Sequence, residues 1–289
     1  AVLYLGWVLV RYGNPDFYHL VTGGEKPMDL AYLNAVIKSS WFPPYDPWFA
    51  GAEMNYYYFG FVLIGSVIKA TGILPTVAYN LAIPTLFAMT GVGAYTLAAN
   101  LASGGEGASP EGARRGRRAG LWAVVLTVLL GNLGEIQLLL KGLAEVGNVQ
   151  FTSLIPGYQL LVSAAAGFWK VVVQGQTLPF RQEWWYWNAT RIMPAGPGEG
   201  AGPITEFPLF TFLYGDLHAH AISLPLTQVA LGIALQWGLS RAPKWPARTL
   251  PPHLVAWRFF RQSLPLIVLA GLTAGALQAT NTWDYPTYL

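Results

Sequence analysis

Long apolar segments recur along this chain, and they constrain its fold more than any other feature. Five of them predict membrane-spanning helices, at residues 1–11, 77–102, 119–140, 217–239 and 263–281. Helix is the expected state, because a backbone in lipid must satisfy its hydrogen bonds within the segment. The first segment is shorter than the about 20 residues that a bilayer core needs, so we expect residues 1–289 to be one transmembrane domain of a longer protein. The expected fold class is an all-α polytopic membrane protein.

Composition excludes several other classes of protein. Only 11% of the residues are charged and 53% are hydrophobic, whereas a soluble domain carries roughly 25% charged residues. Intrinsic disorder is excluded, and an ordinary soluble globule is disfavoured. A net charge of +3 gives no support for nucleic-acid binding, and the absence of cysteine excludes disulfides and thiolate metal sites. The sequence also lacks a Walker loop and the GxGxxG, HExxH and GxSxG motifs, so soluble-nucleotide chemistry is unsupported.

Basic residues predict the orientation of the spans. They crowd two connections, residues 103–118 and 240–262. The positive-inside rule places both connections in the cytoplasm. The segment 119–140 then leads out of the cell and 217–239 leads back, so residues 141–216 lie outside.

Two weaker apolar stretches, 56–72 and 154–174, are predicted to be interfacial or re-entrant. Residues 154–174 lie inside an external stretch and cannot make a single crossing. If the first helix exits, residues 12–76 are external as well, and 56–72 lies on the outer face or dips into it. This topology gathers most polar and aromatic clusters at one membrane surface, as a functional site requires.

Asp29 begins an amphipathic run in the first external loop. Leu30, Leu33, Val36 and Ile37 follow at helical spacing. Asp29 is then either the N-cap of this helix, or a general base or metal ligand at the mouth of a membrane cavity. The spacing alone favours the cap.

A second cluster of ionisable residues stands at the edge of the segment 217–239. Asp216, His218 and His220 are spaced by two residues each, and they include half of the four histidines in the chain. In an extended backbone they would share one face and could form a two-His, one-carboxylate metal site. In a helix only Asp216 and His220 would share a face. The alternative is a set of hydrogen-bonded residues that cap the helix.

Two aromatic runs, at residues 56–58 and 184–187, are typical of interfacial belts. A functional interpretation is that Arg191 or Arg181 clamps a phosphate while the indoles pack on a lipid tail or a sugar face. Asp284, at the end of the last span, fits a cap as well as a ligand.

Three motifs resemble those of the DUF2298 family, the YYY membrane proteins of Chloroflexi and archaea. They are NYYYFG at 55–60, EFP at 206–208 followed by GDLHAH at 215–220, and NTWD at 281–284. The similarity covers nearly the whole chain, with Ala219 where the family more often has Pro, and the chain is shorter than full-length members. The resemblance implies an integral protein of a prokaryotic plasma membrane, with a site that faces the external side.

That family is similar in turn to the GT-C class of glycosyltransferases, which use polyprenyl-phosphate sugars. This resemblance implies a GT-C-like helix bundle with a long first external loop that carries juxtamembrane helices. It also implies sugar transfer to an external acceptor, with Asp29 and Asp216 as catalytic residues. Asp216, His218 and His220 would bind a divalent metal, Mg or Mn, or the leaving lipid phosphate.

Further residues are predicted to bind the substrate or its phosphate: Tyr57, Tyr58, Arg191, Glu206 and Asp284. The predicted partners are the lipid-linked sugar donor, membrane lipids and other membrane subunits, without nucleic acid. Two other functions stay open. One is a non-catalytic scaffold or accessory subunit of a membrane complex, and the other is a transporter, which would need broken helices around a midplane polar site. Catalysis requires that Asp29 and Asp216 share one cavity.

Overall fold

The computed structural model describes residues 1–18, 24–104, 109–180, 187–196, 198, 202–239 and 252–288. These residues form helices, with an isolated bridge between Tyr45 and Glu53 as their only β pairing. The predicted all-α class is confirmed. The chain divides into a first unit, Ala1–Leu129 with Phe212–Leu289, and a second unit, Leu130–Thr211.

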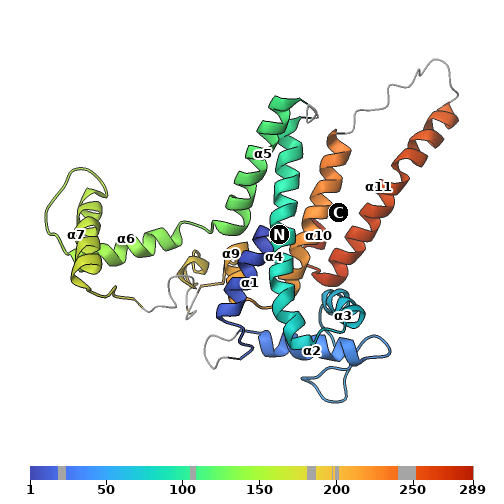
Figure 1. Ribbon diagram of the computed structural model, residues 1–289, viewed down its shortest axis with the longest axis horizontal. Coiled ribbons are helices and arrows are strands. Elements are labelled where there is room, and N and C mark those ends of the chain that lie inside the picture. The colour runs from blue at the N-terminus through green and yellow to red at the C-terminus, as the bar shows by residue number, and fades with distance from the viewer. Residues whose placement is uncertain are drawn as a thin grey trace. The chain divides into compact units, whose positions relative to one another are not determined.

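The first unit contains most of the helices (Figure 1). They are α1 (Val2–Gly13), α2 (Lys26–Lys38), α3 (Phe59–Thr71), α4 (Pro75–Ser103), α5 (Pro110–Val124) with the π-helical turn η1 (Val125–Leu129), α10 (Ala219–Leu239), α11 (Pro252–Thr280) and the short η3 (Tyr285–Thr287). The short helix α9 (Pro208–Tyr214) runs from the second unit into the first.

Three described helices are long and apolar enough to cross a membrane: Pro75–Ser103, Ala219–Leu239 and Ser263–Thr280. They coincide with three of the predicted spans. The predicted span 119–140 is not one continuous helix, because the chain leaves helical conformation between η1 and α6 (Gly134–Gly147). The helices on the two sides of this break, Pro110–Leu129 and Gly134–Gly147, would supply a fourth crossing only if they are counted together as one span.

The core of the first unit forms where α1 packs on α4. The Trp7 ring stacks on Phe87 with centroids 3.9 Å apart, and the Trp7 indole N–H donates to the Phe212 carbonyl at 3.2 Å. Phe212 completes the cluster edge-on to both rings. Because Phe212 lies four residues before Asp216, this contact fixes the chain that leads to the GDLHAH motif.

The helices α2 and α3 lie at the end of α4 where that helix begins (Figure 1). At 1.5 Å per residue, the 13 residues of α3 extend roughly 20 Å, which is short of a bilayer core of about 30 Å. Its length fits the interfacial placement predicted for 56–72.

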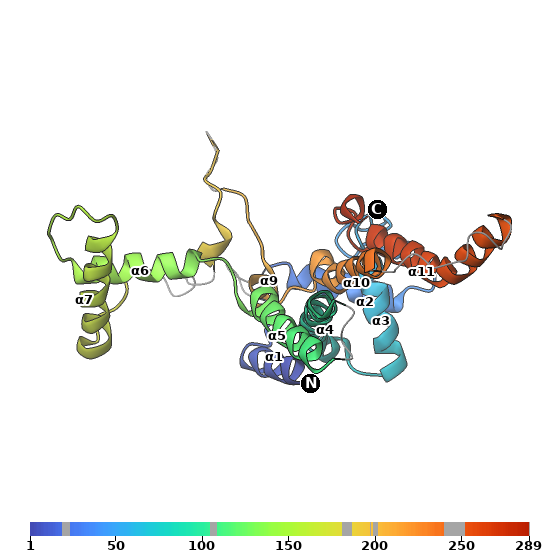
Figure 2. The ribbon, with the colours of Figure 1, turned by 90° about the horizontal axis from the view of Figure 1, so that it is seen from above.

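The second unit is built on a helical hairpin. The helix α7 (Tyr158–Gln174) packs across the C-terminal part of α6, and the two views agree on this crossing (Figure 1, Figure 2). The short turn η2 (Asn188–Thr190) packs against the start of α6, where the Ala189 N–H donates to Glu135 Oε1 at 3.2 Å.

Candidate functional site

Two glycine turns bring the acidic loops together. Gly24 precedes Glu25 with φ +65°, and Gly215 precedes Asp216 with φ +74°, both in the left-handed region that favours glycine. A Cβ on Gly24 would lie 2.5 Å from Asp216 Oδ2, and one on Gly215 would lie 2.7 Å from an Arg11 guanidinium nitrogen. Neither position can accept a side chain without displacing a charged group of the site.

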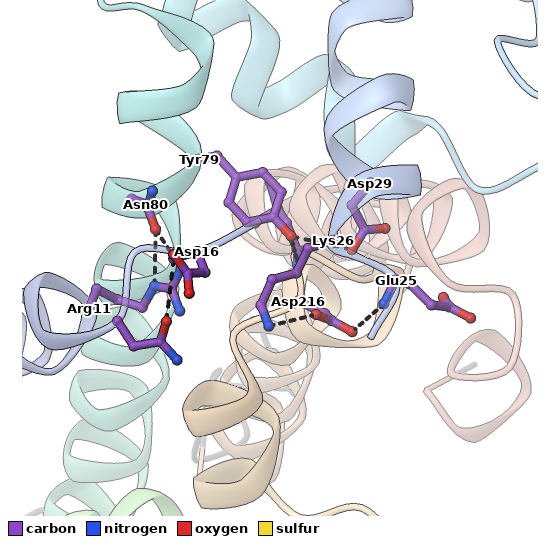
Figure 3. Close-up of polar contacts among 10 residues, drawn as sticks. Arg11, Asp16, Glu25, Lys26, Asp29, Tyr79, Asn80 and Asp216 are labelled. Atoms are coloured by element: carbon purple, nitrogen blue, oxygen red, sulfur yellow. Dashed lines mark hydrogen bonds and ion pairs between the residues drawn. The ribbon is translucent and has the colours of Figure 1, made fainter. Parts of the chain in front are cut away.

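Asp216 binds the start of α2. Its Oδ2 accepts the Glu25 backbone N–H at 3.0 Å, and its Oδ1 lies 3.7 Å from Lys26 Nζ (Figure 3). The Lys26 ammonium also stands 5.1 Å from the centre of the Tyr214 ring. The side chains of Asp216 and Lys26 are both largely buried. Residues 190 positions apart therefore form one ion pair at the end of the bundle.

Asp29 is the fourth residue of α2 and not its cap. The helix begins at Lys26, and Glu25 occupies the N-cap position. The interpretation of Asp29 as a cap is therefore wrong, because one further turn of helix precedes it. The Asp29 side chain is instead fully buried on the inner face of α2.

Tyr79 connects Asp29 to the Asp216 loop. Its hydroxyl donates to Asp29 Oδ2 at 3.5 Å and accepts the Leu217 N–H at 2.8 Å (Figure 3). The second carboxyl oxygen, Asp29 Oδ1, is buried and finds no hydrogen-bond partner among the described residues. The two predicted catalytic acids thus belong to one buried polar cluster, which a single tyrosine links.

Burial raises the pKa of the two acids to different extents. It raises the pKa of Asp29 to about 8, and the charge of Asp216 adds to this effect. Burial also raises the pKa of Asp216, but only to about 6, because the Glu25 N–H and the Lys26 ammonium favour its ionised form. At neutral pH Asp29 is mostly protonated while Asp216 carries a charge. Such a difference between neighbouring carboxyl groups is a property of acid–base sites.

His218 contacts His220 and also residues of the loops before α2 and α3. His218 Nε2 lies 2.8 Å from Glu25 Oε2 and 2.7 Å from the Tyr56 hydroxyl, and His218 Nδ1 lies 2.8 Å from His220 Nδ1. In the part of the chain that the structure describes, no three His, Asp or Glu side chains are placed to hold a metal ion. The arrangement of Asp216, His218 and His220 therefore does not support the predicted metal site.

Three of the predicted binding residues lie elsewhere in the first unit. The Tyr57 ring lies 5.5 Å from that of Tyr56, and Tyr58 stacks on Phe42 at 5.8 Å. Asp284 Oδ2 accepts a hydrogen bond from the Ser223 hydroxyl at 2.5 Å and one from Asn281 Nδ2 at 3.0 Å. Asp284 thus joins the end of α11 to α10, and its side chain makes no cap hydrogen bond to η3.

Arg191 and Glu206 belong to the second unit, and their contacts there are local. The Arg191 guanidinium lies 5.0 Å from the Trp187 ring and donates to the Gly202 carbonyl at 3.5 Å. Glu206 Oε2 accepts the Thr211 hydroxyl at 2.9 Å. Arg181 and residues 184–186 lie outside the described residues.

The sequence interpretation did not single out four residues of this cluster. They are Lys26 and Tyr79, which touch the two acids, and Arg11 and Asn80, which bond each other through the guanidinium and the amide oxygen (Figure 3). Arg11 offered a signal, since a basic residue at the end of an apolar helix is expected to find a polar partner. Lys26 and Tyr79 offered none, because only the tertiary fold brings them to Asp216 and Asp29.

Comparison with known proteins identifies a family. The sequence profile of a family described as an uncharacterized membrane protein, DUF2298, matches residues 1–289. Neither a curated protein nor a solved structure matches the chain.

Proposed function

This chain belongs to the DUF2298 family of membrane proteins, and on this premise we propose that it is a glycosyltransferase. It would move a sugar from a polyprenyl-phosphate donor to an acceptor on the external face of a prokaryotic plasma membrane. One observation carries the proposal. Asp29 is fully buried, has one carboxyl oxygen without a hydrogen-bond partner among the described residues, and belongs to the same cluster as Asp216.

The proposed reaction uses the raised pKa of Asp29, which makes its ionised carboxylate the stronger base of the two acids. Ionised Asp29 takes the proton of an acceptor hydroxyl while the acceptor oxygen attacks the anomeric carbon of the sugar. The bond from that carbon to the phosphate oxygen breaks, and the electron pair leaves with the polyprenyl phosphate. The Lys26 ammonium lies 3.7 Å from Asp216 and would offset the charge of the departing phosphate.

An apolar cavity supports a lipid-linked donor. It has a volume of about 710 Å³ and lies between α1, α4, α10 and α11, where Met89, Val92, Pro225, Val229 and Leu266 line it. This volume lies in the range of ligand sites in proteins. On α4 the cavity begins at Thr85, six residues from Tyr79, or roughly 9 Å along the helix. A lipid chain in this cavity would approach the polar cluster from the membrane side.

The alternative function is a non-catalytic subunit of a membrane complex. It is favoured by the pairing of Asp216, which already has Lys26 and a backbone N–H as partners, as in a structural polar core. Under this alternative the cluster would hold α2 against α4 and the GDLHAH loop, and the protein would transfer no sugar.

A transfer assay separates the two functions. The purified chain is reconstituted in vesicles and supplied with a panel of radiolabelled polyprenyl-phosphate sugars. Asp29→Asn keeps the shape of the side chain but cannot accept the proton, so we expect transfer to fall about 100-fold or more. The matched control is Glu53→Gln, an exposed carboxylate in the same external loop, which should keep full activity. Full activity of Asp29→Asn would refute the assignment, and an inactive wild-type chain would favour the scaffold.

A further inference from the structure

The helix α7 exposes a broad apolar face. Leu161, Phe168, Trp169, Val172 and Val173 are each more than half exposed. They recur along the helix at the spacing of neighbouring turns, so their side chains cover one continuous side. A contiguous apolar patch of this kind marks a contact with a partner, a ligand or a membrane.

The opposite face of α7 is made of small residues that pack on α6. Ser163, Ala164 and Gly167 are buried there. A Cβ on Gly167 would lie 1.7 Å from the Leu143 carbonyl oxygen, and one on Gly147 would lie 1.8 Å from that of Ser163. The two backbones are therefore in direct contact. Small residues four positions apart are the usual means of such packing where the surroundings are as apolar as the helices.

The only charged residue of α7 is satisfied inside the hairpin. Lys170 Nζ donates to the carbonyls of Val146 and Gly147, at 3.0 and 2.9 Å. These carbonyls belong to the last turn of α6, which has no intrahelical donors for them. In water, solvent could satisfy both groups. In lipid, the ammonium and the carbonyls need each other.

The helix α6 has a polar side that α7 lacks. Gln137, Lys141 and Glu145 are exposed and spaced by four residues, so they form a stripe along one side of α6. The two helices have 14 and 17 residues, or roughly 21 and 26 Å, and each is shorter than a bilayer core of about 30 Å. A hairpin with these properties fits the boundary between lipid and water.

We propose that the α6–α7 hairpin is a membrane-interface module. It buries the Leu161, Phe168 and Val172 face of α7 among lipid acyl chains and keeps the Gln137–Lys141–Glu145 stripe of α6 at the headgroups. The occupant of the α7 face is the lipid itself, because the hairpin satisfies the Lys170 ammonium and the last carbonyls of α6 internally, as surroundings without hydrogen-bond partners require. The proposal is independent of glycosyl transfer.

The absence of native cysteine allows a direct test. Val172→Cys carries a thiol-reactive bimane in the full chain, reconstituted in phosphatidylcholine vesicles whose acyl chains are brominated. Glu145→Cys, on the polar stripe of α6, is the matched control. We expect bromine to quench the Val172 probe about threefold more than the Glu145 probe, and aqueous iodide to show the reverse order.

Two results would overturn the proposal. Equal quenching of both probes by iodide would place the α7 face in water. Insensitivity of the Val172 probe to both quenchers would mean that protein covers this face. Phe168→Cys repeats the measurement one turn away, so that a local disturbance by one substitution is recognised.

Discussion

Asp29 lies in surroundings that disfavour its charge. It has no exposed surface, one of its oxygens is without a hydrogen-bond partner among the described residues, and its nearest donor is the Tyr79 hydroxyl at 3.5 Å. Burial of an ionised carboxylate with so few donors costs several kcal/mol, so the folded protein holds the neutral acid at pH 7. Such a group needs a substrate or a rise in pH to become a base.

The folded protein should therefore lose stability as pH rises toward 8. Between the ordinary pKa of 3.8 and the raised pKa of about 8, the folded state holds a proton on Asp29 that the unfolded state has released. The free energy of unfolding then falls as pH increases. Asp216 acts in the same direction only up to about pH 6, because its pKa is raised less. Above about pH 6 the effect of Asp29 therefore continues without that of Asp216.

Thermal unfolding in detergent, measured from pH 6 to pH 8, tests this prediction. The wild-type melting temperature should decline over this interval more steeply than that of Asp29→Asn, which cannot ionise. Parallel curves for the two proteins would show that Asp29 does not carry the shifted proton.

Removal of the Tyr79 hydroxyl should destabilise the site. Tyr79→Phe leaves the buried Leu217 N–H without its acceptor and removes the hydrogen bond that the Tyr79 hydroxyl donates to Asp29 Oδ2. The expected loss is about 1–3 kcal/mol of unfolding free energy. Tyr95→Phe on the same helix is the control. Denaturant unfolding monitored by circular dichroism gives the comparison, and equal stability of the two variants would contradict the linking role.

At the scale of elements, a single glutamine joins two of the membrane-crossing helices. Gln228 on α10 donates from Nε2 to the Thr90 carbonyl of α4 at 2.8 Å. Its Oε1 lies against the backbone of Gly93, one turn further along α4, where a Cβ would stand only 1.9 Å away. A glycine and a polar side chain facing each other allow close packing of helices in lipid.

Gly93→Ala should weaken the contact between α4 and α10. The added methyl group must displace the flexible Gln228 amide, which breaks its hydrogen bond to the Thr90 carbonyl, and we expect a loss of about 1–3 kcal/mol. Gly232→Ala is the matched control on α10, because its Cβ would meet Leu97 at an ordinary 3.7 Å. Thermal stability in detergent ranks the two variants. If Gly93→Ala is as stable as Gly232→Ala, the close contact between Gln228 and Gly93 does not determine how α4 packs on α10.

At the scale of the molecule, the chain consists of two compact units of unequal character. The first contains the three membrane-crossing helices and the acid cluster, and the second contains the α6–α7 hairpin. The packing of the second unit rests on backbone contact between Gly147 and Gly167, which both lie within that unit. A defect in this hairpin should therefore stay within its own unit.

Gly167→Ala provides the test. A methyl group would collide with the Leu143 carbonyl and loosen α7 from α6. Hydrogen–deuterium exchange should become faster in residues 134–174 and stay unchanged in α4 and α10. Faster exchange throughout the chain would show that the two units unfold as one.

Local hydropathy was enough to predict the all-α membrane class and three of the crossing helices, because lipid accepts only helices that are apolar over about 20 residues. The sequence also singled out Asp29 and Asp216 as candidate catalytic residues, a role that stays a prediction. The contacts that the two acids make with other residues depend on the tertiary structure. Asp29 is not a cap, because one turn of helix precedes it. Tyr79 contacts Asp29 and Lys26 contacts Asp216, and no regular spacing in the sequence predicts either contact. The break at residues 130–133 and the pairing of His218 with His220 likewise depend on packing between distant segments, which periodicity along the chain does not encode.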